Sequence, residues 1–230
     1  MNVAIITAAG RSERMGGRNK LFLPLMGVPI LAYTLLALER CSSMEKIIVV
    51  IEGSDKKQFE EEVRARYPLG KILEVVEGGK ERQDSVLNGL RALPRETARV
   101  TIHDGARPLV TTSLILKAIE ALEDCDGVVT AVPLKDTIKE VSSENLIRTT
   151  VERKDLWAAQ TPQVFRPEIL MKAHQKARMD GFYGTDDSVL LERLGYKVKV
   201  VLGSYENIKI TTPEDLVVAE AILRGREAKL

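Results

Sequence analysis

A short basic loop near the start of the chain combines residue types that suit the binding of a polyphosphate. The small residues at positions 8–10 (Ala-Ala-Gly) follow an apolar run and let a ligand approach the backbone closely. Within the next ten positions there are four basic residues: Arg11, Arg14, Arg18 and Lys20. Successive backbone N–H groups in such a turn can cradle phosphate oxygens. The spacing matches neither the dinucleotide fingerprint nor the Walker A loop, so the loop predicts a phosphate site of another class.

Two later segments place further ligand-binding groups at the ends of apolar runs. Gly78 and Gly79 lead into a helix start with Ser85, which could offer N–H groups and a hydroxyl to a base or ribose. Asp104 ends another run, a position where a carboxylate commonly holds a ribose hydroxyl or a hydrated metal ion. Arg107 could grip a phosphate through two parallel hydrogen bonds. A plain turn and a structural Asp–Arg pair are the alternatives here.

The remaining polar positions are weaker signals when each is taken alone. His103 ends a buried run, so a structural role is favoured over a general base. His174 is expected on a surface helix and is assigned no role. Four polar groups fall at the ends of expected strands or loops: Asp136-Thr137, Arg153, Gly184-Thr185-Asp186 and Asn207-Ile208-Lys209.

The elements that position these residues alternate between strands and helices. Short apolar runs predict strands over 3–8, 46–51, 71–77, 99–103 and 127–132. Helical spacing predicts helices over 29–38, 54–66 (with Ser54 as its cap), 82–93 and 112–122. This order is typical of a three-layer α/β fold, in which helices cover both faces of a mostly parallel sheet. Ligands bind beyond the carboxyl ends of such strands. We therefore expect three segments to meet at one rim: 9–20, 78–85 and 104–108.

The alternation stops after Pro133. Residues 134–152 are polar, alternate weakly and predict a protruding β-arm, of a kind that usually pairs with another subunit. Beyond the arm we expect helices over 167–179, 187–194 and 213–224, and strands over 198–202 and 208–210. No repeat or linker divides the chain. Residues 1–230 are therefore expected to form a single domain, with the arm as its subdomain.

The composition argues against several classes of protein. The 34 Lys and Arg residues nearly balance the 33 Asp and Glu residues, so there is no global charge that would favour nucleic acid. Cys41 and Cys125 are far apart and form no C-x-x-C pair, which fits a reducing compartment. No apolar run approaches the ~18 residues of a membrane span, and the first residues lack a basic signal-peptide region. We expect a cytoplasmic protein that binds neither nucleic acid nor a membrane.

Taken together, five motifs resemble the 2-C-methyl-D-erythritol 4-phosphate cytidylyltransferase family of the non-mevalonate isoprenoid pathway. These motifs are Ala8-Ala9-Gly10-x-Ser12-x-Arg14-Met15 with Lys20, Gly78-Gly79-x-x-Arg82-x-x-Ser85, His103-Asp104-x-Ala106-Arg107-Pro108, Thr161-Pro162-Gln163 and Asn207-Ile208-Lys209. They occur in order along almost the whole chain. The resemblance implies a Rossmann-like nucleotidyltransferase fold, transfer of a cytidylyl group from CTP to methylerythritol phosphate, and an arm that forms a homodimer.

The resemblance also implies a role for each matching residue. Catalytic roles are implied for Arg14, Lys20, Arg153 and Lys209. Nucleotide binding is implied for Ala8, Ala9, Gly10, Ser12, Gly79, Ser85, Asp104 and Ala106. Acceptor binding is implied for Asp104, Arg107, Thr137, Arg153, Thr161, Thr185 and Lys209, with Arg153 and Thr161 supplied by the arm region of a second subunit. Mg²⁺ is implied mainly on the CTP phosphates, with Asp104 as the candidate protein ligand.

Two other functions remain open at the level of sequence. A ribitol 5-phosphate cytidylyltransferase would share the CTP loops, although the residues Thr150-Val151-Glu152-Arg153-x-x-Leu156-Trp157 favour the methylerythritol enzyme. A non-catalytic nucleotide sensor on the same fold would be expected to lack Arg14 or Lys20, and both are present. An NAD-dependent oxidoreductase is disfavoured because the dinucleotide fingerprint fails.

Overall fold

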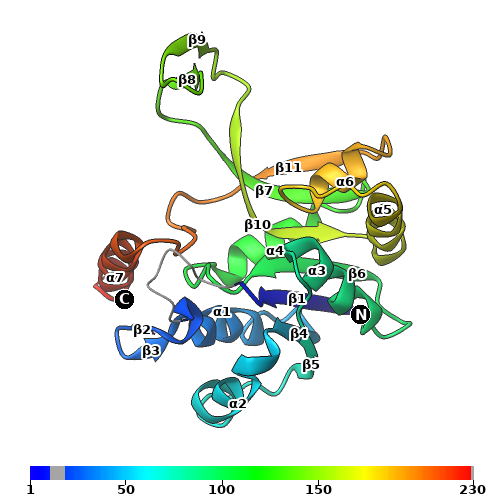
Figure 1. The fold of residues 1–230 in the computed structure, drawn as a ribbon. Coiled ribbons are helices and arrows are strands. Elements are labelled where there is room, and N and C mark those ends of the chain that lie inside the picture. Colours follow the sequence, from blue (N-terminus) through cyan, green and yellow to red (C-terminus); the bar gives the residue numbers. More distant parts are fainter. Residues whose placement is uncertain (11–18, 229–230) are drawn as a thin grey trace.

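A computed structural model describes residues 1–10 and 19–228 of the chain (Figure 1). Five of the residues singled out above lie outside these described residues: Arg11, Ser12, Arg14, Met15 and Arg18. Within the described ranges, no helix is both long enough and apolar enough to cross a membrane.

A seven-stranded sheet forms the centre of the molecule, in the order β11-β7-β10-β6-β1-β4-β5 (Figure 1). Its strands are β1 (Asn2–Ala8), β4 (Lys46–Ile51), β5 (Ile72–Glu77), β6 (Arg99–Asp104), β7 (Gly127–Pro133), β10 (Trp157–Phe165) and β11 (Val198–Leu202). β10 runs antiparallel to both of its neighbours, β6 and β7, and the other neighbouring pairs are parallel. The predicted mostly parallel α/β sheet is confirmed.

Strand β1 shows why these apolar runs become buried strands. Val3 and Ile5 pack into the core on one face of the sheet, whereas Ala4, Ile6 and Ala8 pack into the core on the other face. Successive side chains of a strand point to opposite faces, so a strand covered on both sides must be apolar throughout. Continuous runs, rather than alternating ones, therefore mark the central strands of this fold.

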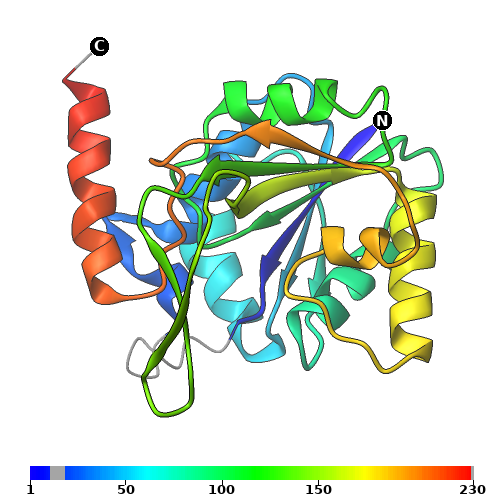
Figure 2. The ribbon, with the colours of Figure 1, turned by 90° about the horizontal axis from the view of Figure 1, so that it is seen from above.

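Helices cover both faces of the sheet and complete three layers (Figure 2). On one face lie α1 (Ile30–Glu39), α2 (Lys56–Phe59) and α4 (Thr112–Glu120). On the other lie α3 (Arg82–Arg91), α5 (Pro167–Met179) and α6 (Ser188–Glu192). The last helix, α7 (Pro213–Glu227), packs at the side of the molecule beside the small hairpin β2 (Pro24–Leu25) and β3 (Val28–Pro29).

The expected helix over 54–66 is present as a continuous helical segment over 53–64, but its hydrogen-bonding pattern changes twice along its length. A 3₁₀ turn, η3 (Gly53–Asp55), precedes α2, and a π-helical turn, η4 (Glu60–Arg64), follows it. Ser54 does not cap the segment, because it lies inside the 3₁₀ turn. In α2 and η4, only Phe59 and Val63 are buried, so few apolar contacts hold a regular helix in place.

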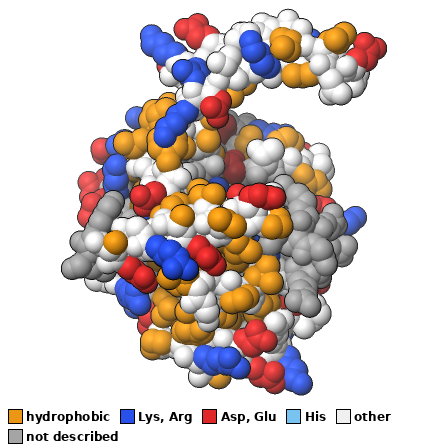
Figure 3. All heavy atoms as spheres, turned by 90° about the vertical axis from the view of Figure 1, so that its left-hand side faces the viewer, with side chains coloured by type: hydrophobic (Ala, Val, Ile, Leu, Met, Phe, Trp, Pro, Cys, Tyr) orange, Lys and Arg blue, Asp and Glu red, His pale blue; other side chains and the backbone are white. Residues whose placement is uncertain are grey.

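The segment after Pro133 leaves the sheet, as the sequence predicts. Strands β8 (Ile138–Val141) and β9 (Ile147–Val151) form a separate two-stranded antiparallel sheet. This hairpin stands away from the rest of the molecule (Figures 1 and 3). Apolar, basic and acidic side chains are all exposed on it (Figure 3).

In the second half of the chain, the central strands differ from the sequence expectation at two places. Residues 208–210 form no strand, although Ile210 N–H donates to the carbonyl of Ala106. Strand β10 is absent from the sequence prediction, because Pro162 lies inside it and proline cannot donate to a strand ladder. The sheet accommodates Pro162 through an irregular register between Gln160 and Gln163.

Candidate active site

The three predicted loops meet in one cleft at the carboxyl ends of the central strands. The cleft has a volume of about 710 Å³, which falls in the range of small-molecule and cofactor sites. Its lining includes Ala9, Gly10 and Lys20 from the first loop, Gly78–Arg82 and Ser85 from the second, Asp104 and Ala106 from the third, and Lys209. The expectation that segments 9–20, 78–85 and 104–108 share one rim is therefore confirmed for their described residues.

Close packing around the second loop explains the glycine pair. A Cβ atom added to Gly78 would lie 2.2 Å from the Cβ of Ala9, and one added to Gly79 would lie 2.3 Å from the Cβ of Asp84. Both positions therefore need glycine. The Gly79 N–H donates to Ser85 Oγ at 3.0 Å, which ties the loop to the first turn of α3. The positive end of the α3 dipole thus reaches the cleft, where it favours an anion.

Asp104 is the centre of the charged groups in the cleft. Its carboxylate oxygens lie 3.4 Å from Arg82 Nε, 3.4 Å from Arg107 Nε and 3.0 Å from Lys209 Nζ. Burial alone would raise the pKa of Asp104, but these three cations outweigh burial and hold that pKa far below its usual range. Asp104 is therefore an ionised carboxylate that orients three cationic side chains.

The backbone around Asp104 is fixed from the neighbouring strand. Thr161 Oγ1 accepts a hydrogen bond from the Asp104 N–H at 3.0 Å. Asn207 donates to the Thr161 carbonyl at 2.8 Å, and its own carbonyl accepts from Arg107 Nη1 at 2.8 Å. These bonds connect β6, β10 and the segment that carries Lys209 into one support beneath the cleft.

The expected place of Thr161 is wrong. It lies buried in β10 of the central sheet and not in the arm, because the chain has already returned to the sheet by Trp157. Thr137, Arg153 and Thr185 are exposed and are not among the described residues that line the cleft. Within one chain, the structure therefore brings Lys209 and Arg107 to Asp104 but leaves these three residues apart from it.

The two histidines are both buried. The ring of His103 is enclosed, its Nε2 lies 3.3 Å from the Arg107 carbonyl, and burial lowers its pKa to about 4. His103 is therefore neutral near pH 7, which fits a structural role. The surface position expected for His174 is wrong, since its Nε2 lies 3.2 Å from a buried carboxylate oxygen of Asp187. Its spacing from Leu170 and Ala177 on the buried face of α5 was a sequence signal for this.

Two residues of the charged network were missed from the sequence. Arg82 appears there only as part of a motif, and Asp187 has no role. In the structure Arg82 bridges two carboxylates, with Nη1 at 2.8 Å from Asp187 and Nε at 3.4 Å from Asp104. Arg82 follows the glycine pair at a helix start, which was an available signal. No pattern could pair it with Asp187, which is 105 positions away.

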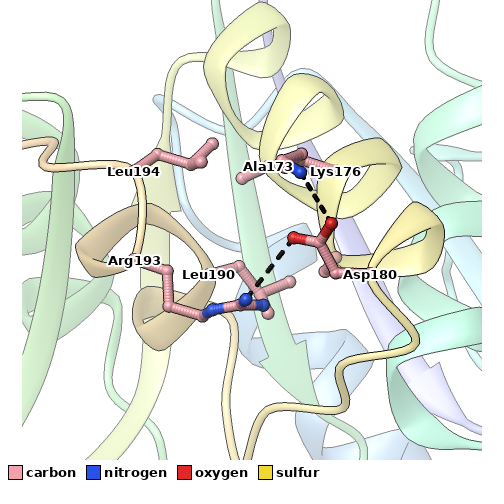
Figure 4. A pocket seen from close by; sticks show the side chains of 7 residues that line it. Ala173, Lys176, Asp180, Leu190, Arg193 and Leu194 are labelled. Atoms are coloured by element: carbon pink, nitrogen blue, oxygen red, sulfur yellow. Dashed lines mark hydrogen bonds and ion pairs between the residues drawn. The ribbon is translucent and has the colours of Figure 1, made fainter.

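A second hollow, between α5 and α6, is too small for a nucleotide (Figure 4). Its volume is about 90 Å³, and it shares no lining residue with the cleft. Asp180 lies 2.6 Å from Lys176 and 3.4 Å from Arg193, so these charged groups already have partners.

A mostly parallel α/β sheet whose strand ends gather a glycine-rich turn, a helix N-terminus and several cations defines an enzyme of the nucleotidyltransferase class. The family model described as "IspD: 2-C-methyl-D-erythritol 4-phosphate cytidylyltransferase" matches residues 2–225. The chain therefore belongs to the 2-C-methyl-D-erythritol 4-phosphate cytidylyltransferase family.

Individual relatives support this assignment along nearly the whole chain. The 2-C-methyl-D-erythritol 4-phosphate cytidylyltransferase of Caldanaerobacter subterraneus subsp. tengcongensis is 50% identical over 226 residues, covering 97% of this chain and 100% of the relative. The crystal structure of 4-diphosphocytidyl-2C-methyl-D-erythritol synthase from Anaerococcus prevotii matches with a TM-score of 0.86 at 36% identity, covering 97% of this chain and 96% of the other. The Thermus thermophilus cytidylyltransferase structure gives 0.78 at 32% identity, covering 96% and 98%.

Proposed function

We propose that the chain joins CTP and 2-C-methyl-D-erythritol 4-phosphate to give 4-diphosphocytidyl-2-C-methyl-D-erythritol and pyrophosphate. An oxygen of the acceptor phosphate forms a bond to the α-phosphorus of CTP, and the bond between that phosphorus and the α–β bridging oxygen breaks. Membership of the family over residues 2–225 supports this activity. The structural observation that carries the proposal is the cluster of Arg82, Arg107 and Lys209 around Asp104 in a nucleotide-sized cleft.

Both reactants are anions, so the main task of the protein is to position them and to neutralise their charge. We assign the α-phosphate to Lys20, which lines the cleft, and to Arg14, six positions earlier in the sequence. Lys209 also lines the cleft as a further cation, and its Nζ lies 3.0 Å from Asp104. No covalent intermediate is needed in this scheme, which fits the neutral, enclosed state of His103.

The nucleotide would occupy the first two loops of the cleft. We assign the triphosphate to the backbone of Ala8, Ala9 and Gly10, with Ser12 in the loop that follows. We assign the base to Gly79 and Ser85, and the ribose to Asp104 and Ala106. In support, the described members of this set cluster around one cleft, and most of them line it.

The acceptor is assigned to Arg107, Lys209, Thr185 and residues of the arm. Thr137 and Arg153 flank the arm hairpin and do not line the cleft of their own chain. We therefore propose a homodimer in which the arm carries these two residues to the cleft of a second subunit. Thr161 would act from within its own chain, since its hydroxyl holds the backbone of Asp104. In this scheme residues 1–230 form one nucleotidyltransferase domain, and 134–152 is its arm.

We propose Mg²⁺ as the divalent cation, bound mainly through the phosphates of CTP. Among the described residues, no group of three or more His, Cys, Asp or Glu side chains is placed to hold a metal ion. Asp104 is the candidate ligand, but each of its oxygens already contacts a cation. Phosphate oxygens are therefore the better ligands for this hard cation, which neutralises triphosphate charge when bound. The two cysteines are free and buried, which supports the cytoplasm as the compartment we propose.

A pyrophosphate-release assay with parallel acceptors tests the proposal. Purified protein, CTP and Mg²⁺ should release pyrophosphate with 2-C-methyl-D-erythritol 4-phosphate. Faster release with ribitol 5-phosphate would overturn the acceptor. Binding of CTP with no release from either acceptor would instead indicate a nucleotide sensor. Replacement of CTP by ATP, GTP or UTP in the same assay tests the assignment of the base.

A further inference from the structure

A line of polar contacts runs from the buried face of helix α5 to the cleft. His174 Nε2 lies 3.2 Å from one oxygen of Asp187, and the other oxygen lies 2.8 Å from Arg82 Nη1. Arg82 Nε in turn lies 3.4 Å from Asp104. The side chains of His174 and Asp187 are at most 1% exposed, whereas Arg82 is 30% exposed and lines the cleft. The two buried members therefore meet the cleft through Arg82.

The geometry of these contacts indicates that Asp187 is ionised and that His174 donates to it. Burial alone would raise the pKa of Asp187, but Arg82 and His174 outweigh it and lower that pKa. Because a carboxylate accepts hydrogen bonds and does not donate them, His174 Nε2 carries the proton that faces Asp187. The ion pair between Arg82 and the buried Asp187 costs desolvation that well-packed apolar side chains would avoid. Stability alone therefore does not explain this pair.

The position of Asp187 accounts for the orientation of Arg82. Without it, the Arg82 guanidinium could turn to pair with both oxygens of Asp104 or extend toward solvent. Asp187 takes one amino group at 2.8 Å, and Asp104 receives only the 3.4 Å contact from Nε. The guanidinium is thereby held across two carboxylates at the cleft surface. Because the Arg82 side chain is already held in place, it loses less conformational entropy when a ligand binds.

We infer that Asp187, fixed by His174, is a positioning residue that holds Arg82 in the cleft for contact with the nucleotide. This inference rests on the proposed function, because it takes CTP as the occupant of the cleft. Asp187 touches Arg82 and not the cleft itself, so its effect should appear only while Arg82 is present.

Neighbouring contacts make the start of α3 and the loop before α6 one unit. Gln83, next to Arg82, donates to the carbonyl of Phe182 at 3.0 Å and accepts from the Gly184 N–H at 2.9 Å. Asp186, next to Asp187, accepts from Gln163 at 2.8 Å and caps the Val189 N–H at 3.2 Å. Asp186 thus fastens the same loop through Gln163 and Val189 rather than through Arg82, which makes Asp186→Asn a matched control for Asp187→Asn.

A double-mutant cycle tests the inference through the kinetics and binding of CTP. We expect Asp187→Asn to lower kcat/KM for CTP by about 10- to 100-fold, and to weaken CTP binding in calorimetry. In an Arg82→Ala background, the same substitution should cost less than about twofold, because its target is gone. Asp186→Asn should instead give the same fold-change with and without Arg82. Losses from Asp187→Asn and Arg82→Ala that simply multiply would overturn the inference.

Two further measurements keep the test decisive. If Asp187→Asn fails to fold, His174→Leu replaces it: we expect a loss of about 3- to 10-fold in CTP kcat/KM that disappears in the Arg82→Ala background. A loss that persists there would overturn the inference as well. A wild-type protein that neither binds CTP nor releases pyrophosphate would overturn the proposed function instead, so the two failures are distinguishable.

Discussion

The cleft and the arm differ in where their side chains find partners. In the cleft, the carboxylate of Asp104 contacts three cationic side chains of its own chain. In the arm, two strands pair with each other, and Leu146 and Ile147 are more than 60% exposed. A lone two-stranded hairpin is at best marginally stable in water. The comparison shows that the cleft is organised within one chain, whereas the arm leaves large apolar side chains exposed, as expected if it docks on the second subunit that we propose.

The largest effect should follow from removing the two cations that we assign to the α-phosphate of CTP. We expect Lys20→Ala and Arg14→Ala each to lower kcat by about 10²–10³, the range for loss of a preorganised charge donor. Lys57→Ala is the control, since Lys57 is an exposed lysine on α2 whose ion pair with Glu61 is also on the surface. Steady-state pyrophosphate release measures all three. Near-normal turnover in both Lys20→Ala and Arg14→Ala would contradict the roles proposed for these two residues.

The pH dependence of the free energy of unfolding should be dominated by buried groups near the cleft and not by surface groups. The pKa of His103 is lowered by burial to about 4, from about 6.5 in an unfolded chain. As the pH falls from 6.5 to 4, the unfolded chain therefore gains a proton that the native chain does not. The free energy of unfolding should fall in that window by on the order of 3 kcal/mol. Asp104 and Asp187, whose pKa values are lowered, lose their contribution only at lower pH, below about 4.

Urea unfolding at a series of pH values between 7 and 4 measures this slope. His103→Asn keeps a donor for the Arg107 carbonyl and removes the titrating ring. Its slope between pH 6.5 and 4 should be flatter than that of the wild-type chain. Equal slopes would assign the acid sensitivity to other groups. The exposed arm pair Glu140–Arg148, at 3.7 Å, should add little in either protein.

Removing a cation from the arm should affect the acceptor and spare the nucleotide. We expect Arg153→Ala to lower kcat/KM for the acceptor by about 10- to 100-fold, the cost of a lost charged contact, with CTP binding nearly unchanged. Arg148→Ala is the matched control, since this arginine also lies on the arm but pairs with Glu140. Equal losses of CTP and acceptor use would mean that the arm does not carry an acceptor contact.

Mixed dimers test whether the arm of one subunit serves the cleft of the other. Consider a heterodimer of one Arg153→Ala chain and one Lys20→Ala chain. The cleft of the Arg153→Ala chain keeps Lys20 and would receive Arg153 from its partner, whereas the other cleft would have neither residue. If the arm serves the partner's cleft, about half of the wild-type activity per dimer should return, because a twofold dimer has two equivalent sites. Isolated heterodimers that stay inactive would contradict the shared site.

Sequence patterns predicted the parts of the molecule that depend on local periodicity. Continuous apolar runs located β1, β4 and β6, and the parallel order then placed their loops at one rim. The patterns failed where distant contacts decide. Strand β10 contains a proline and is held by its neighbours, and Arg82 meets Asp187 across 105 positions. The fold and the loops of the site were thus predictable, but the charge network beneath them was not.

The smallest effect on the chain itself should come from the apolar side chains of the arm. Ile147 is 64% exposed, so Ile147→Ser should change the free energy of unfolding of the monomer by less than about 0.5 kcal/mol. If the arm docks on a partner, the same change removes apolar area from the interface, and the dimer Kd should rise by about tenfold. Val217→Ser is the control, since Val217 is 70% exposed and belongs to α7, which lies away from the arm (Figure 1). Analytical ultracentrifugation measures both variants. An unchanged dimer Kd for Ile147→Ser would mean that the arm does not dock on a second subunit through this side chain. The side chain is mostly exposed within its own chain, so an interface is the remaining place where it could be buried.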